Sequence, residues 1–223
     1  MPSSAVIFDV DGTLVDTNYL HTLAWFRGFR DAGEVVSMSA IHRLIGMGSD
    51  HLVSELLGHE SEEASDGHSR HFKKLMPEIE AFPGASDLLD EVHRRGAMVV
   101  LATSANEEEL EAMLEAVDPP EDSIDHVTKK DDVEHSKPSP DIFRVALDAT
   151  GLDPSQVLVV GDTVWDVEAA AKCDLRFVGV LTGGISRQEL EEAGAMAIYE
   201  DVAQLLRELD DSPIQELLGS GPS

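Results

Sequence analysis

The sequence predicts an α/β protein built around a parallel β-sheet, and two regularities in its 223 residues support that prediction. Short apolar runs rich in Val, Ile and Leu, typical of buried strands, alternate with stretches of helical periodicity. Several helical stretches are followed by a glycine suited to a helix C-cap, namely Gly96, Gly151 and Gly194. Strands that alternate with helices form parallel sheets with helices on both faces. We therefore expect a Rossmann-like core.

The expected strands cover residues 5–8, 98–102, 124–127, 157–160, 175–180 and 196–198, the last being the weakest. From residue 83 onward, helical patterns fall between these strands, at 85–95, 107–117, 140–150, 166–172 and 187–193. Each strand-to-helix junction then lies at the carboxyl edge of the sheet, where open α/β sheets bind their ligands.

Residues 17–82 break this alternation, because helical stretches at 21–30, 40–45, 51–57 and 62–76 follow one another without a strand. We expect residues 1–16 and 83–210 to form the α/β core, and residues 17–82 to form an inserted α-helical cap over its carboxyl edge. The alternative is that these helices complete one domain. Residues 211–223 end in Ser, Gly and Pro, and we expect a flexible tail.

Composition narrows the class of protein. Hydrophobic residues make up 42% and charged residues 27%, which is typical of a globular chain. No apolar run is long enough to span a membrane and no basic, apolar leader precedes the core, so we expect a cytoplasmic protein. The single Cys173 excludes an internal disulfide and argues against a cysteine-based zinc site.

The formal net charge is −28, from 44 acidic residues against 16 Lys and Arg. Such a field repels nucleic acids and anionic lipid, so we expect neither as a partner. A high-salt cytoplasm would favour this composition because salt screens self-repulsion, although an ordinary cytoplasm remains an open alternative. We expect a monomer or a small homo-oligomer.

The first strand ends in two acidic residues, Asp9 and Asp11, and Gly12 permits a tight turn after them. Two carboxylates this close repel each other unless they share a cation or a proton. The pattern indicates a hard metal ion beside a carboxylate nucleophile. A solvated Asp-Gly turn is the simpler alternative.

Two later segments add groups that bind anions. Thr103, Ser104 and Ala105 follow the second strand, and a hydroxyl with backbone N–H groups at a strand-to-helix junction can hold a phosphoryl group. A helix cap is the alternative for Thr103. Lys137 stands in Ser-Lys-Pro-Ser-Pro, where two prolines stiffen the loop and would hold its ammonium group near the carboxylates.

The strand at 157–160 repeats the pattern of the first strand, because Gly161 and Asp162 follow it directly and Asp166 lies one helical turn further. We expect Asp162 and Asp166 to join Asp9 around one Mg²⁺, which prefers oxygen ligands. For Asp166, stabilisation of a helix N-terminus is the alternative role.

The order of these segments resembles the four motifs of the haloacid dehalogenase superfamily: Asp-x-Asp, then Thr, then Lys-Pro, then Gly-Asp-Thr-x-x-Asp. In that superfamily a cap is inserted between the first and second motifs. The segment after the first motif further resembles the phosphoglycolate phosphatase and β-phosphoglucomutase branch of this superfamily, through Asp16, Thr17, His21, Ala24 and Trp25.

The resemblance implies a haloacid dehalogenase-like fold and a phosphatase that hydrolyses a small phosphorylated metabolite through an aspartyl-phosphate. It implies that Asp9 is the nucleophile and that Asp11 is the general acid and base, a role for which anionic neighbours should raise its pKa. Thr103 and Lys137 would position phosphoryl oxygens. Mg²⁺ would be held by Asp9, the backbone carbonyl of Asp11, Asp162 and Asp166.

We expect six further residues to contact the substrate: Gly12, His21, Gly46, Ser49, Ser104 and Ala105. Packing of the hinge is the alternative for His21, as it is for Trp25, and a simple turn is the alternative for Gly46. The remaining histidines, including His68, are expected to be solvated surface groups.

Two other functions stay open. A sugar-phosphate mutase of the β-phosphoglucomutase type shares these motifs, but that branch carries Lys and Arg where this chain has Ile45 and Ser49, and Glu where it has Gly161. A phospho-acceptor switch also uses Asp, Thr and Lys, but it lacks the helical insertion. Dehalogenation is disfavoured because dehalogenases usually lack an acid at the position of Asp11.

Overall fold

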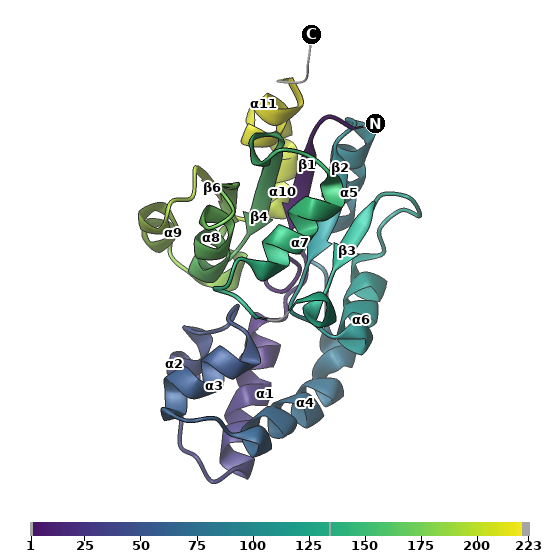
Figure 1. The fold of residues 1–223 in the computed structure, drawn as a ribbon. Helices are drawn as coiled ribbons and strands as arrows, with labels where there is room; N and C mark the ends of the chain where they lie inside the picture. The colour runs from purple at the N-terminus through teal and green to yellow at the C-terminus, as the bar shows by residue number, and fades with distance from the viewer. Residues whose placement is uncertain (1, 134, 220–223) are drawn as a thin grey trace.

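The computed structural model describes residues 2–133 and 135–219, and its centre is a six-stranded sheet (Figure 1). The strand order is β3-β2-β1-β4-β5-β6, and every pair of neighbours is parallel. In chain order the strands are β1 (Ala5–Phe8), β2 (Met98–Ala102), β3 (His126–Thr128), β4 (Val157–Gly161), β5 (Arg176–Val180) and β6 (Ala197–Tyr199). The predicted Rossmann-like α/β core is therefore confirmed.

Helices cover both faces of this sheet. Alternate residues of β1 point to opposite sides, so Val6 and Phe8 enter one apolar core while Ala5 and Ile7 enter the other. The first core is shared with α5 (Ala85–Arg94), α6 (Glu107–Val117), α10 (Val202–Arg207) and α11 (Pro213–Gly219). The second is shared with α7 (Asp141–Thr150), α8 (Val164–Ala171) and α9 (Arg187–Ala193).

Four helices follow β1 and lie beyond the carboxyl edge of the sheet, at the lower end of the molecule in Figure 1. They are α1 (Asn18–Asp31), α2 (Met38–His42), α3 (Ser49–Leu57) and α4 (Glu62–Leu75), which we call the cap. The cap has an apolar cluster of its own, centred on Trp25 and Phe29. Its two connections to the sheet pair at Val15 and Ala81, next to the predicted boundaries at 16/17 and 82/83.

One prediction about the chain end is wrong. Residues 213–219, expected in a flexible tail, form helix α11, whose Ile214 and Leu217 are buried in the first core. The rest of that predicted tail, 220–223, lies outside the described residues. Within the described ranges, no helix is both long and apolar enough to cross a membrane.

Candidate active site

Three carboxylates meet at the carboxyl edge of the sheet. Asp9 follows β1 and Asp162 follows β4, and because these strands are neighbours their ends lie side by side. Asp166 reaches the same point from the first turn of α8. One oxygen of each carboxylate lies within 4.8 Å of the others, and all three residues are buried. The structure thus brings together the acids that the sequence analysis assigned to the metal.

Two polar side chains that the sequence analysis did not single out hold Asp162 in place. The hydroxyl of Thr13 donates to Asp162 Oδ1 at 3.0 Å, and the amide of Asn18 donates to Asp162 Oδ2 at 2.8 Å. The backbone of Gly12 lies against the hydrogen-bonded pair of Asp162 and Asn18, because a Cβ at this position would fall 2.4 Å from Asp162 Oδ2 and 2.3 Å from Asn18 Nδ2. Gly12 therefore makes room for the carboxylate.

Asp166 has a second role in the helix. Thr163 and Asp166 form a capping box at the start of α8, in which each side chain accepts a hydrogen bond from the other residue's backbone N–H. The capping box uses Asp166 Oδ2, so Oδ1 remains to face Lys137 at 2.7 Å. The alternative role of Asp166, stabilisation of the helix N-terminus, is thus present, and its role as a metal ligand stays a prediction.

Lys137 lies within the carboxylate cluster and is only 2% exposed. Its ammonium group pairs with Asp9 Oδ1 and Asp166 Oδ1, and its peptide bond to Pro138 is cis. Burial acts to lower the pKa of the Lys137 ammonium, but the two carboxylates outweigh it and raise that pKa. Lys137 therefore stays charged.

One ammonium group does not balance three buried carboxylates. Burial, together with the charges of Asp166 and Asp11, raises the pKa of Asp9 to about 7 against the opposing effect of Lys137. Burial and the same kind of repulsion raise the pKa of Asp162 well above its usual range. Excess negative charge in a set of hard oxygen donors fits a divalent cation such as Mg²⁺.

Asp11 differs from the sequence-based expectation. Its carboxylate accepts from Thr17 Oγ1 at 2.7 Å, lies 3.1 Å from His21 Nε2 and accepts from Thr103 Oγ1 at 3.3 Å. Burial raises the pKa of Asp11, but the contacts with His21 and Thr17 outweigh it, so the net shift is downward. The predicted upward shift is wrong for this conformation, because the partners of Asp11 favour its anion.

A cavity of about 330 Å³ lies between this cluster and the cap. Asp9, Asp11 and Lys137 line one end of it. Among the predicted substrate contacts, the cavity is lined by His21, Gly46, Ser49, Ser104 and Ala105. Gly12 and Thr103 are not among its lining residues; Thr103 is fully buried, and its hydroxyl contacts Asp11 and the backbone N–H of Ala105.

The cap side of the cavity contains a residue that the sequence analysis placed on the surface. His68 of α4 is half-buried, stacks on Trp25 with ring centroids 4.2 Å apart, and lines the cavity. The expectation of a solvated histidine is wrong because α4 packs this face against α1. No sequence signal marked His68, since its partners His21 and Trp25 lie more than forty positions away in the chain.

A parallel sheet with acidic residues after β1 and β4, and a helical insertion after β1, defines a class of enzyme. Residues 4–174 match the haloacid dehalogenase-like hydrolase family, and the chain belongs to this family. It is 31% identical over 221 residues to the phosphoglycolate phosphatase of Rhodospirillum rubrum, covering 90% of this chain and 88% of that protein. These findings confirm the predicted family and the expectation of a hydrolase.

This chain is also similar to two other proteins, and it covers nearly all of one of them but only a small part of the other. A solved hydrolase from Pseudomonas syringae superposes with a TM-score of 0.87 at 35% identity, covering 93% of this chain and 98% of that one. The Protein SUPPRESSOR OF QUENCHING 1, chloroplastic, of Arabidopsis thaliana is 29% identical over 91% of this chain, but the chain spans only 20% of that protein's length.

Proposed function

We propose that the protein is a Mg²⁺-dependent phosphatase that hydrolyses the phosphate monoester of a small metabolite through an aspartyl-phosphate on Asp9. The observation that carries this proposal is the position of Asp9, whose carboxylate lines the cavity while Lys137 holds its Oδ1. Among the side chains that the structure describes, its Oδ2 accepts one long hydrogen bond, at 3.3 Å, from the hydroxyl of Thr13. A carboxylate oriented in this way can act as a nucleophile.

In the first step an Asp9 oxygen bonds to phosphorus, the ester P–O bond breaks, and the departing oxygen takes a proton from Asp11. In the second step a water molecule gives a proton to Asp11, and the oxygen of that water bonds to phosphorus. The bond between Asp9 and phosphorus breaks, so phosphate leaves and the Asp9 carboxylate is restored. An incoming phosphate dianion adds negative charge near Asp11, which raises its pKa and favours the protonated form that the first step needs.

Charge neutralisation is the main demand of phosphoryl transfer. Lys137 supplies a fixed positive charge beside Asp9, and Ser104 and Ala105 line the cavity before the start of α6. Mg²⁺ held by Asp9, Asp162 and Asp166, with the backbone carbonyl of Asp11 as a further ligand, would neutralise charge on the phosphoryl oxygens.

The walls of the cavity favour a hydrolase over a mutase. Within the described residues, its only lysines are Lys130 and Lys137, both from the core, and it is lined by no arginine. The cap contributes Ile45 and Ser49 where a mutase of the similar branch carries cations to hold a second phosphate. Among the described residues, the cap itself therefore offers a bisphosphate intermediate no lysine or arginine in this cavity, and the ammonium group that lies nearest to Ser49, at 3.5 Å, belongs to Lys130 of the core.

The test is phosphate release from p-nitrophenyl phosphate with Mg²⁺, in the wild type and in Asp9→Asn. We expect many turnovers per wild-type protein, and a loss of about 10³-fold or more in kcat for Asp9→Asn because the nucleophile is removed. Incorporation of one phosphoryl group per chain without turnover would instead favour a phospho-acceptor switch.

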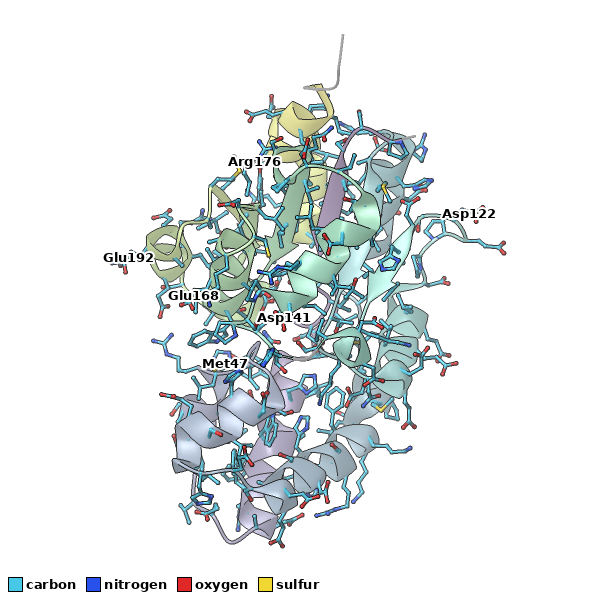
Figure 2. All side chains as sticks on the ribbon, in the orientation of Figure 1. Met47, Asp122, Asp141, Glu168, Arg176 and Glu192 are labelled. Carbon is cyan, nitrogen blue, oxygen red and sulfur yellow. The ribbon has the colours of Figure 1, made fainter. Side chains whose placement is uncertain are left out.

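The matched control is Asp122→Asn, which makes the same chemical change at an exposed loop far from the cap (Figure 2). This variant should keep wild-type activity. Normal turnover in Asp9→Asn would refute the assignment of Asp9 as the nucleophile.

A further inference from the structure

The two longest cap helices, α1 and α4, cross at a pair of glycines. A Cβ on Gly28 would lie 2.6 Å from the backbone nitrogen of His68, and a Cβ on Gly67 would lie 2.7 Å from the Cα of Gly28. The helix backbones therefore touch, which only glycine at both positions allows. This close approach brings His68, the residue after Gly67, next to His21 and Trp25 on α1.

Stacked rings fix the orientation of His21. It packs on Phe72 with ring centroids 3.8 Å apart and lies beside His68 at 5.3 Å, while His68 stacks on Trp25. The His21 side chain is only 15% exposed, so its ring has little freedom. Both ring nitrogens of His21 consequently point at defined partners.

Those partners form a hydrogen-bonded row from the cap to the core. His21 Nε2 lies 3.1 Å from Asp11 Oδ1, and His21 Nδ1 lies 3.1 Å from His68 Nε2. Burial, followed by the charges of His21 and Lys130, pushes the pKa of His68 well below its usual range, so His68 is neutral. The row therefore gives each ring nitrogen of His21 one polar partner: Nδ1 faces the cap residue His68, and Nε2 faces the carboxylate of Asp11.

We propose that His68 is a positioning residue for the acid–base step, which acts by holding the ring of His21 in place and thereby the carboxylate of Asp11. His21 and His68 belong to the cap and Asp11 to the loop after β1, so the row is complete only with the cap placed as in this structure. This inference rests on the proposed function, because it requires Asp11 to give its proton to the leaving group.

Displacement of Asp11 should change how the rate depends on the leaving group, which loss of stability alone would not do. A leaving group that is a weak base departs as an anion, whereas a more basic one must receive the proton of Asp11 as the bond breaks. Phenyl phosphate and p-nitrophenyl phosphate are similar in shape, but phenolate is much more basic than p-nitrophenolate. A misplaced Asp11 should therefore slow the phenyl ester more than the nitrophenyl ester.

The experiment compares kcat/KM for these two esters in His68→Phe, which keeps a ring over Trp25 but has no nitrogen. General acid catalysis contributes about 10²–10⁴-fold, so partial loss should lower the rate on phenyl phosphate about tenfold more than on p-nitrophenyl phosphate. His68→Gln, whose side-chain amide can donate or accept a hydrogen bond near the place of Nε2, should restore most of the wild-type ratio. His68→Leu provides the same test if His68→Phe does not fold.

The matched control is His71→Phe on the same helix, because His71 pairs with Asp31 and is not among the residues that line the cavity. Its ratio of the two rates should equal that of the wild type. An equal loss on both esters in His68→Phe, or no rescue by His68→Gln, would overturn the proposal. Absence of Asp9-dependent turnover in the wild type would instead refute the proposed function, and so the two failures are distinguishable.

Discussion

Asp9 and Asp11 are two residues apart and both are buried from water to a large degree, yet their pKa values move in opposite directions. Burial acts to raise both. The difference comes from the partners, because Asp9 faces the carboxylates of Asp166 and Asp11, whereas Asp11 faces His21 and Thr17. At the scale of single residues, the neighbours that the fold brings into contact decide which carboxylate is held as an anion.

The first prediction at this scale concerns pH and metal. Asp9 has a pKa of about 7 in the folded protein against an ordinary value of 3.8, so between these values the folded chain binds more protons than the unfolded chain. Without a divalent ion, stability should therefore fall as the pH rises from about 4 to 7. At pH 8, Mg²⁺ at a hundredfold its Kd should add about 2.7 kcal/mol, or about 5–10 °C in Tm.

Asp162→Asn is the informative variant for this measurement, since it removes one of the crowded carboxylates and a predicted ligand. Its Tm in EDTA at pH 8 should exceed that of the wild type, and the gain with Mg²⁺ should shrink. Asp122→Asn, far from the site, should behave as the wild type does. A wild-type Tm that ignores Mg²⁺ would contradict the predicted metal site.

At the scale of elements, the cap meets the core through the loop between α2 and α3. The backbone N–H of Gly48 in this loop donates to the carbonyl of Lys137 at 3.1 Å. A Cβ on Gly48 would fall 1.9 Å from the Cβ of Ser136, so the loop seats on the Lys137 loop only because Gly48 has no side chain. In Figure 2, Met47 of the same loop faces the core across this boundary.

The substitution Gly48→Ala should therefore prevent the loop between α2 and α3 from packing against the Lys137 loop, and so displace the cap from the core. We expect kcat/KM to fall about tenfold or more, because small misplacements in a closed site are costly, while the Tm changes little. Adding Ser136→Gly removes the colliding atoms, so the double variant should regain the activity of Ser136→Gly alone. If the double variant is no better than Gly48→Ala, steric exclusion at this contact is not the cause.

At the scale of the whole molecule, a net charge of −28 on 223 residues opposes the compact state through self-repulsion. The exposed ion pairs, such as Arg43 with Glu189 and Arg187 with Glu200, offset little of this, because surface pairs contribute at most about 1 kcal/mol each. Added salt should stabilise the folded chain more than these ion pairs do, since the distance over which charges repel one another falls from about 10 Å at 0.1 M to about 3 Å at 1 M.

We accordingly expect the Tm at pH 8 to rise with KCl between 0.1 and 2 M. A gain of about 2 kcal/mol would correspond to about 4–8 °C for a chain of this length. The same titration near the sequence pI of 4.4 serves as the control, because there the net charge and its repulsion vanish. A melting curve unchanged by molar salt at pH 8 would remove the high-salt hypothesis.

The amino-acid pattern alone predicts the parallel sheet, the helical insertion and the acids at the ends of β1 and β4. It could do so because alternating apolar runs place Asp9, Lys137, Asp162 and Asp166 at one edge whatever the details of packing. It did not reveal the helix formed by residues 213–219, because burial of Ile214 and Leu217 outweighs the turn-forming composition at the end of the chain.

The environment of Asp11 and the position of His68 depend on how the helices pack in three dimensions. Thr17 and His21 approach Asp11 because α1 starts beside the loop after β1, and His68 reaches His21 because Gly28 and Gly67 let two helices touch. The contacts of His68 with His21 and of Gly28 with Gly67 join residues about forty positions apart, and none of these contacts leaves a local periodicity in the chain. A pKa, a ring orientation and a close helix crossing each depend on pairs of groups in space, and one-dimensional patterns do not encode such pairs.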